Sequence, residues 1–184
     1  MTDLDHIRRV RRDAQLLRSE SDVAAGIAEM AAAIAAKYAQ SNPIVMAVMQ
    51  GGAFTAVNLC EHFDFPYEFD YVHVTRYGEE LEGNSELTWH TRPRRKLTGR
   101  TVILVDDVLD HGVTLRELCS VLGESRPREL AVAVLVHKQL QLPLNRPQPD
   151  FVGFVSDDRY LFGCGMDYKG YWRGLPALYA VAHP

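Results

Sequence analysis

Short apolar runs alternate with amphipathic stretches along most of the chain. The run at residues 102–105, and similar ones at 43–50, 129–137 and 148–155, have the length and composition of strands buried on both faces. Apolar positions at helical spacing predict helices over 21–39 and 53–62 and from Val113 onward. Strands that alternate with helices in this way indicate an α/β fold with a mostly parallel sheet flanked by helices.

Three segments depart from this alternation. Residues 67–77 alternate as a half-buried strand does, and the acidic stretch 78–91 has no clear periodicity. We expect 78–91 to be either a lid over a site or an ordinary solvated loop. From Tyr160 the chain is irregular with short extended pieces, and we expect the two chain ends to form a small subdomain together.

Composition narrows the class of protein. A length of 184 residues suits a single domain, and a net charge of −4 provides no electrostatic footprint for nucleic acid. No apolar stretch is long enough to cross a bilayer, and the polar start does not resemble a signal peptide. Three widely spaced cysteines, Cys60, Cys119 and Cys164, are typical of free thiols in a reducing compartment. We therefore expect a cytoplasmic protein with no membrane or nucleic-acid partner.

Carboxylates follow the strand at 102–105. Asp106 and Asp107 come directly after it, and Asp110 lies three residues further on. In α/β sheets, ligands bind beyond the carboxyl ends of the strands, so these side chains are placed to contact one. Carboxylates there can accept hydrogen bonds from the hydroxyls of a ribose.

A glycine turn and the start of a helix follow the carboxylates. Gly112 lets the backbone approach a ligand, and the first amides of the helix from Val113 have no partner within it, so they suit a phosphate. Thr114 adds a hydroxyl. Together these features favour a phosphorylated sugar, with Mg²⁺ between the carboxylates and the phosphate. The alternative is a solvated turn rich in aspartate.

Residues 102–115 resemble the 5-phosphoribosyl-1-pyrophosphate (PRPP) signature of type I phosphoribosyltransferases, and 44–173 resemble their hypoxanthine-guanine branch. The resemblance implies purine salvage: transfer of the phosphoribosyl group from PRPP to hypoxanthine or guanine, giving IMP or GMP and pyrophosphate, with Mg²⁺. It also implies the type I fold as one domain over 1–184, and a homodimer or homotetramer. The core would cover about 20–145, and a hood would combine the N-terminal segment with about 148–184.

The resemblance assigns roles around PRPP. It implies that Asp110 faces N7 of the purine as general base or acid. It implies that Asp106 and Asp107 bind the ribose hydroxyls and contribute to the metal site, together with Asp158. The residues implied for the 5′-phosphate are His111, Gly112, Val113 and Thr114.

The resemblance also assigns the purine and pyrophosphate contacts. Lys138 would donate to O6 of the purine, and Phe151 and Val152 would stack on the base and pair with it through the backbone. Asp157 is an alternative to Asp158 for the metal. The pyrophosphate loop would contain Gln50 and Gly51 and a non-proline cis peptide, and the lid would begin at Arg76 and Tyr77.

Four positions depart from the usual family pattern. Gln50 replaces a basic residue, Asp106 a glutamate, His111 a small hydroxyl residue and Leu142 an arginine.

Two other functions are alternatives: a PRPP-binding regulator of the pyrimidine-operon attenuator type, and a non-catalytic ligand-sensing domain. Asp110 and the acidic balance argue against the regulator, which binds RNA. Asp110, Lys138 and Asp158 together argue against the sensing domain. Hypoxanthine, guanine and xanthine stay open as alternative bases.

Overall fold

A six-stranded sheet forms the centre of this computed structural model, which describes residues 3–76, 87–140 and 146–182. The strand order is β4-β3-β2-β5-β6-β7, and every neighbouring pair is parallel except β3 and β4. The mostly parallel α/β sheet predicted from the sequence is thus confirmed. The strands are β2 (Ile44–Met49), β3 (Glu68–Arg76), β4 (Leu87–Thr91), β5 (Thr101–Leu109), β6 (Glu129–Lys138) and β7 (Phe151–Ser156).

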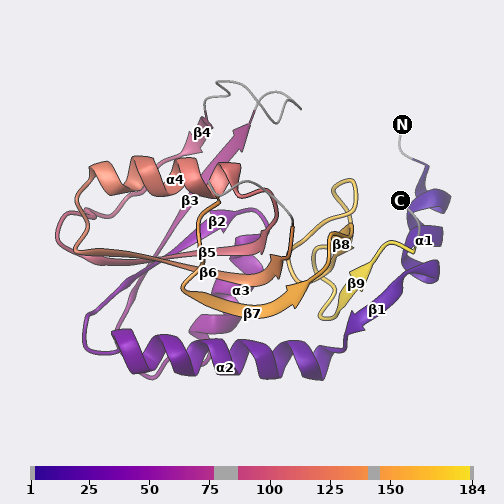
Figure 1. The fold of residues 1–184 in the computed structure, drawn as a ribbon, viewed down its shortest axis with the longest axis horizontal. Coiled ribbons are helices and arrows are strands. Elements are labelled where there is room, and N and C mark those ends of the chain that lie inside the picture. Colours follow the sequence, from indigo (N-terminus) through magenta and orange to yellow (C-terminus); the bar gives the residue numbers. More distant parts are fainter. Residues whose placement is uncertain (1–2, 77–86, 141–145, 183–184) are drawn as a thin grey trace.

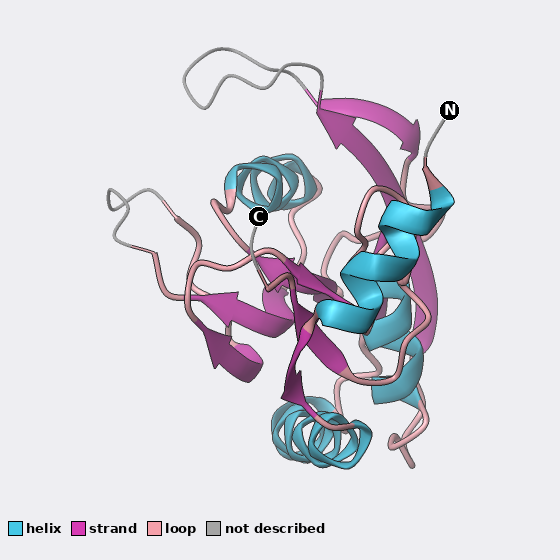
Figure 2. Cartoon of the chain, turned by 90° about the vertical axis from the view of Figure 1, so that its right-hand side faces the viewer, coloured by secondary structure: helices cyan, strands magenta, loops and turns pink. Residues whose placement is uncertain are grey.

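Helices cover both faces of this sheet. Figure 1 shows α2 (Glu20–Tyr38) along one side and α4 (Val113–Glu124) along the other, and Figure 2 shows both nearly end-on with the sheet between them. The helix α3 (Gly52–Cys60) packs against α2 and β5. Each face buries its own apolar cluster, so the sheet is apolar on both sides.

The chain ends form a second, three-stranded antiparallel sheet in the order β1-β9-β8, which we call the terminal sheet. Its strands are β1 (Gln15–Arg18), β8 (Leu161–Phe162) and β9 (Leu178–Ala180), and α1 (Leu4–Asp13) precedes it. Figure 1 shows it beside the right-hand end of the large sheet, toward which β7 points. The expected association of the two chain ends is therefore present.

The structure corrects several expected boundaries. Helix α2 begins at Glu20, one residue before its predicted start, because Ser19 caps it in a reciprocal capping box with Asp22. Strand β5 continues four residues beyond Val105, so Asp106 and Asp107 lie within it. Residues 87–91 of the expected loop pair with β3 as a strand, while the remainder, 78–86, lies outside the described residues.

None of the described helices is both long and apolar enough to span a membrane.

Candidate active site

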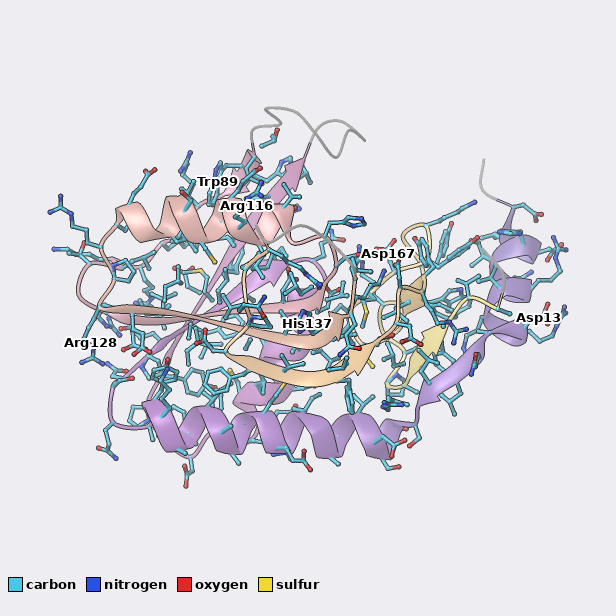
Figure 3. The ribbon with its side chains drawn as sticks, in the orientation of Figure 1. Asp13, Trp89, Arg116, Arg128, His137 and Asp167 are labelled. Carbon is cyan, nitrogen blue, oxygen red and sulfur yellow. The ribbon has the colours of Figure 1, made fainter. Side chains whose placement is uncertain are left out.

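A cavity of about 520 Å³ opens at the carboxyl ends of β2, β5 and β6. In Figure 3, His137 marks the end of β6, and Asp167 lies in the loops of the terminal sheet that face it. The cavity brings together most of the residues that the sequence singled out: Gln50, Gly51, Asp106, Asp107, Asp110, His111, Gly112, Val113, Thr114 and Lys138.

Asp106 and Asp107 form a pair of carboxylates in the last half of β5. Asp107 is only 8% exposed, and each carboxylate accepts the amide of the residue that follows it, at 2.9 and 2.8 Å. Burial, together with the negative charge of Asp107, raises the pKa of Asp106 well above its ordinary value. Burial also raises the pKa of Asp107, although the positive charge of Arg173 opposes this shift. The pair is thus poised to gain from a cation or from hydroxyl donors.

The loop after β2 closes one side of the carboxylate pair. The peptide between Met49 and Gln50 is cis, as the family resemblance implies for this loop. A Cβ atom at Gly51 would lie 1.8 Å from Oδ2 of Asp107, so only glycine leaves room for this carboxylate. Gly51 therefore brings backbone and carboxylate together at the floor of the cavity.

The turn before α4 presents backbone amides to the cavity. Gly112 has a φ of +76°, a conformation that favours glycine, and it precedes the helix as its N-cap without a side-chain cap. The first hydrogen bond of the helix runs from the amide of Arg116 to the carbonyl of Gly112. The amides of Val113, Thr114 and Leu115 precede this bond, and the first turn has no acidic residue, so the helix start suits an anion.

Asp110 and Lys138 form a close, charged side-chain pair at the cavity. Lys138 Nζ donates to Oδ2 of Asp110 at 2.7 Å, and the lysine side chain is only 9% exposed. Oδ1 of Asp110 is buried and has no hydrogen-bond partner among the described residues, although Nδ1 of His111 lies 3.1 Å away. The carboxylate therefore has one oxygen engaged by a cation and one oxygen able to accept a further proton donor.

Three residues predicted on the purine side, Phe151, Val152 and Asp158, do not line the cavity. Phe151 packs against the apolar cluster on the α2 face and Val152 against the cluster on the α4 face. The reason is that β7 is a core strand, whose alternate side chains face opposite sides of the sheet. Asp158 lies 3.5 Å from Lys138 Nζ and is 68% exposed.

Residues 160–173 supply the cavity wall that the sequence reasoning missed. Tyr160 and Leu161 line it, and Asp167 Oδ1 pairs with Arg173 Nη2 at 2.6 Å. Arg173 also donates to the carbonyl of Gly165 at 2.7 Å. The sequence contains one sign of this wall: Tyr160 and Leu161 form a second aromatic–aliphatic pair, nine residues after Phe151 and just before a segment rich in glycine.

The remaining predicted contacts lie at the end of β3. Arg76 is the last residue of this strand and pairs with Leu87 through the backbone. The side chain of Arg76 and the whole of Tyr77 lie outside the described residues.

The donor set of the cavity fits a magnesium ion held jointly with a ligand. Asp106, Asp107 and Asp167 contribute carboxylate oxygens to the lining. Within the described ranges, no three or more His, Cys, Asp or Glu side chains are grouped so that they could hold a metal ion. Mg²⁺ commonly binds through one or two carboxylates plus phosphate oxygens and water, and the carboxylates of this cavity match that pattern.

The two adjacent carboxylates in β5, Asp106 and Asp107, are predicted to lower the stability of the folded protein when no cation is bound. An acid whose pKa is raised by folding destabilises the folded state as pH rises above the ordinary value of 3.8, and the penalty is absent below it. Asparagine at position 106 removes the penalty and keeps an oxygen for the amide of Asp107. We expect Asp106→Asn to melt at a higher temperature than the wild type at pH 8 without divalent cations.

Differential scanning fluorimetry from pH 4 to pH 8 measures this effect. The gain in melting temperature should shrink as pH falls toward 4, whereas Asp64→Asn, at an exposed site, should show no such trend. If Asp106→Asn melts below the wild type at pH 8, the buried charges of Asp106 and Asp107 do not destabilise the folded state, and the prediction is wrong.

Comparisons with known proteins agree with this geometry. The family model of the phosphoribosyl transferase domain matches residues 16–169. The chain is 32% identical to the hypoxanthine-guanine-xanthine phosphoribosyltransferase of Tritrichomonas foetus, over 89% of each protein. It is 31% identical to the hypoxanthine-guanine phosphoribosyltransferase of Aquifex aeolicus, over 91% of this chain and 94% of that protein. A solved hypoxanthine-guanine-xanthine phosphoribosyltransferase superposes with a TM-score of 0.85 at 28% identity, covering 94% of this chain and 99% of that one. The chain therefore belongs to the phosphoribosyl transferase domain family.

Proposed function

We propose that the protein transfers the 5-phosphoribosyl group of PRPP to hypoxanthine or guanine, forming IMP or GMP and pyrophosphate. One observation supports this proposal most strongly: a single cavity contains three kinds of group. The carboxylate pair of β5 and the start of α4 lie on one side, and the Asp110–Lys138 pair lies on the other. The relatives of highest similarity described above carry names with this activity. They favour an enzyme over a PRPP-binding regulator.

The phosphate and ribose of PRPP fit the β5–α4 side of the cavity. The 5′-phosphate would accept hydrogen bonds from the amides of Val113 and Thr114, where the dipole of α4 favours negative charge. His111 and the Thr114 hydroxyl lie on the same lining and would add donors. Asp106 and Asp107 would accept from the ribose hydroxyls. A bound Mg²⁺ would neutralise charge among these carboxylates and the pyrophosphate oxygens.

The leaving pyrophosphate fits the loop after β2. Backbone groups of Gln50 and Gly51 border the cavity, and Gln50 supplies an uncharged amide where a positive charge would be expected for this ligand. Arg173 lies on the opposite wall and provides a positive charge near Asp107. Arg76 would add a second positive charge from the end of β3. These groups would stabilise the charge that builds on the leaving group as its bond to C1 breaks.

The purine would occupy the space beside Asp110 and Lys138. Lys138 would donate to O6, and Asp110 would accept the hydrogen at N7 or return it, as a general base or acid. Tyr160 and Leu161 border the cavity, so we propose that they replace Phe151 and Val152 as the stacking and backbone contacts of the base. Asp167 likewise replaces Asp158 as the carboxylate of the purine side. In this arrangement the terminal sheet is the hood over the base.

Incubation with PRPP, Mg²⁺ and each of four bases tests the proposal. Hypoxanthine and guanine should give IMP and GMP with release of pyrophosphate, and adenine should react far more slowly than either. Xanthine is the informative fourth base, because the relative from Tritrichomonas foetus carries it in its name. Product with none of the four bases would reject the enzymatic function.

Two properties of the whole protein complete the proposal. We propose a homodimer or homotetramer, which light scattering on the purified protein would test. Phe54 and Val57 of α3 are 39% and 51% exposed and offer apolar surface for such contacts. We also propose a cytoplasmic location, because all three cysteines are free thiols.

A further inference from the structure

One guanidinium joins the ends of the two strands that carry the Asp110–Lys138 pair. The backbone pairing of β5 with β6 ends at Leu109 and His137. Beyond this point, Arg146 Nη1 donates to the carbonyl of Lys138 at 2.6 Å, and Nη2 donates to the carbonyl of Leu109. The side chain thus acts as an additional cross-strand link where the ladder of the sheet has stopped.

The stem of the same side chain supports the turn before α4. A Cβ atom at Gly112 would lie 2.9 Å from Cγ of Arg146, so the stem packs closely against this turn. Arg146 therefore contacts three parts of the site: the residue before Asp110, the backbone of Lys138 and the start of the phosphate turn.

The partial burial of the Arg146 guanidinium costs free energy, and the packing of its stem alone does not explain why an arginine lies here. Nε of Arg146 is buried without a hydrogen-bond partner among the described residues. Partial burial lowers the pKa of its guanidinium, although the negative charge of Asp110 opposes this shift. An apolar side chain of similar length would fill the same space without a buried charge or an unpaired donor. What only the guanidinium supplies is a rigid fork with two parallel donors.

We propose that Arg146 is a positioning residue that fixes the backbones of Asp110 and Lys138 so that their side chains meet the purine at a set spacing. This proposal rests on the proposed function. Leu109 O belongs to the peptide bond that leads into Asp110, and Lys138 O belongs to the lysine itself, so one rigid group sets the separation of the two backbones. Without it, each side chain keeps its chemistry but loses its position relative to the other.

Arg146→Met tests the role, because methionine keeps an apolar stem against Gly112 and removes all donors. We expect kcat/KM for hypoxanthine to fall roughly 10- to 100-fold, as for a misplaced catalytic group. The KM for PRPP should change less than about threefold, because the phosphate turn keeps its packing. Arg146→Lys keeps the charge but replaces the guanidinium fork with a single ammonium group, and its activity should lie between those of the methionine variant and the wild type.

Arg100→Met is the matched control. Arg100 also joins two parts of the chain, through Glu68 and the carbonyl of Asn42, but it lies near the amino end of β5, away from the cavity. Its loss should lower the melting temperature and leave the KM for hypoxanthine unchanged. If Arg146→Met also changes only the melting temperature, Arg146 is structural and the proposal fails.

A readout independent of turnover separates this proposal from the proposed function. Lys138 is nearly buried and paired, so acetic anhydride should acetylate it slowly in the wild type, as followed by mass spectrometry. We expect several-fold faster acetylation of Lys138 in Arg146→Met, or in Arg146→Lys if the methionine variant does not fold. Wild-type rates in both variants would overturn the positioning role, whereas an inactive wild type would overturn only the proposed function.

Discussion

Asp110→Asn is expected to lower turnover with hypoxanthine or guanine by roughly 10²-fold or more, while PRPP binding stays nearly intact. Asparagine has nearly the shape of aspartate, and its oxygen can still accept from Lys138 Nζ, which lies 2.7 Å from Oδ2 of Asp110. What the variant loses is the ability to take a proton from the purine or return it. The carbonyl and amide of asparagine are not a base of useful strength, so the chemical step suffers most.

The surroundings of Asp110 are consistent with this proposed step. Oδ2 is held by Lys138, whereas Oδ1 is buried and has no hydrogen-bond partner among the described residues. An acceptor left unpaired in a buried place gains strongly from a donor, and the ring N–H of a purine is such a donor. The turn that follows Asp110 is proposed to bind the 5′-phosphate through backbone amides. We therefore expect the contacts to PRPP to be kept when the side chain of Asp110 is changed.

Steady-state kinetics and equilibrium binding of PRPP distinguish the outcomes. A fall in kcat with an unchanged PRPP dissociation constant supports the proton role, and Asp64→Asn, at an exposed site, serves as the control for the change of charge. Wild-type turnover in Asp110→Asn would leave the residue only the role of opening the turn before α4. A parallel loss of PRPP binding would place it on the sugar rather than on the base.

Local signals made the β5–α4 side of the cavity, where we propose that PRPP binds, predictable from the sequence. Residues 101–115 form one contiguous strand, turn and helix, and each part has a distinct pattern: a buried β-branched run, a glycine with positive φ and a helical repeat. Because the chemistry follows the chain directly, neighbours in sequence are also neighbours in the cavity. The same holds for Gln50 and Gly51, which follow β2 immediately.

The wall formed by residues 160–173, where we propose that the purine binds, could not be placed from local patterns. Tyr160 and Asp167 reach the cavity through a segment whose left-handed backbone at Gly163, Cys164 and Gly165 has no periodicity to read. That segment is anchored by pairing of β1 with β9, two elements about 160 positions apart in the chain. The sequence could not show that Phe151 packs in the core, because an aromatic residue that begins a strand has the same local pattern in a core as in a binding site.

The short N-terminal elements were missed for a related reason. Helix α1 is dominated by charged residues and buries only Ile7, and its apolar residues, Leu4, Ile7 and Val10, are too few to resemble a core helix. Strand β1 has four residues and gains its structure from β9 rather than from its own sequence. Such elements depend on tertiary contacts, which a single sequence does not display.

Lys138→Met is expected to reduce the preference for 6-oxopurines over adenine by roughly 10²-fold. A hydrogen bond from a charged donor contributes about 1.5 to 3 kcal/mol, which corresponds to roughly 10- to 100-fold in kcat/KM. Hypoxanthine and guanine would lose this bond to O6. Adenine, whose 6-amino group is itself a donor, would no longer face a buried ammonium group that it cannot satisfy.

Burial makes this discrimination strong. The side chain of Lys138 is 9% exposed, so water cannot readily replace a missing acceptor on the base. Methionine keeps the length of the side chain in β6 and removes only charge and donors. The values of kcat/KM for hypoxanthine, guanine and adenine measure the effect. Lys37→Met, at a half-exposed lysine paired with Glu129, controls for the lost charge, and an unchanged preference in Lys138→Met would exclude contact with O6.

The two largest expected effects are linked through one contact. Lys138 Nζ holds Oδ2 of Asp110, so each single substitution disturbs the partner as well as the substrate. Losses at residues that act as a unit are not additive, and the double variant Asp110→Asn/Lys138→Met should therefore lose less than the product of the two single losses. Strictly multiplicative losses would show that the two side chains serve the purine independently, despite the 2.7 Å between them.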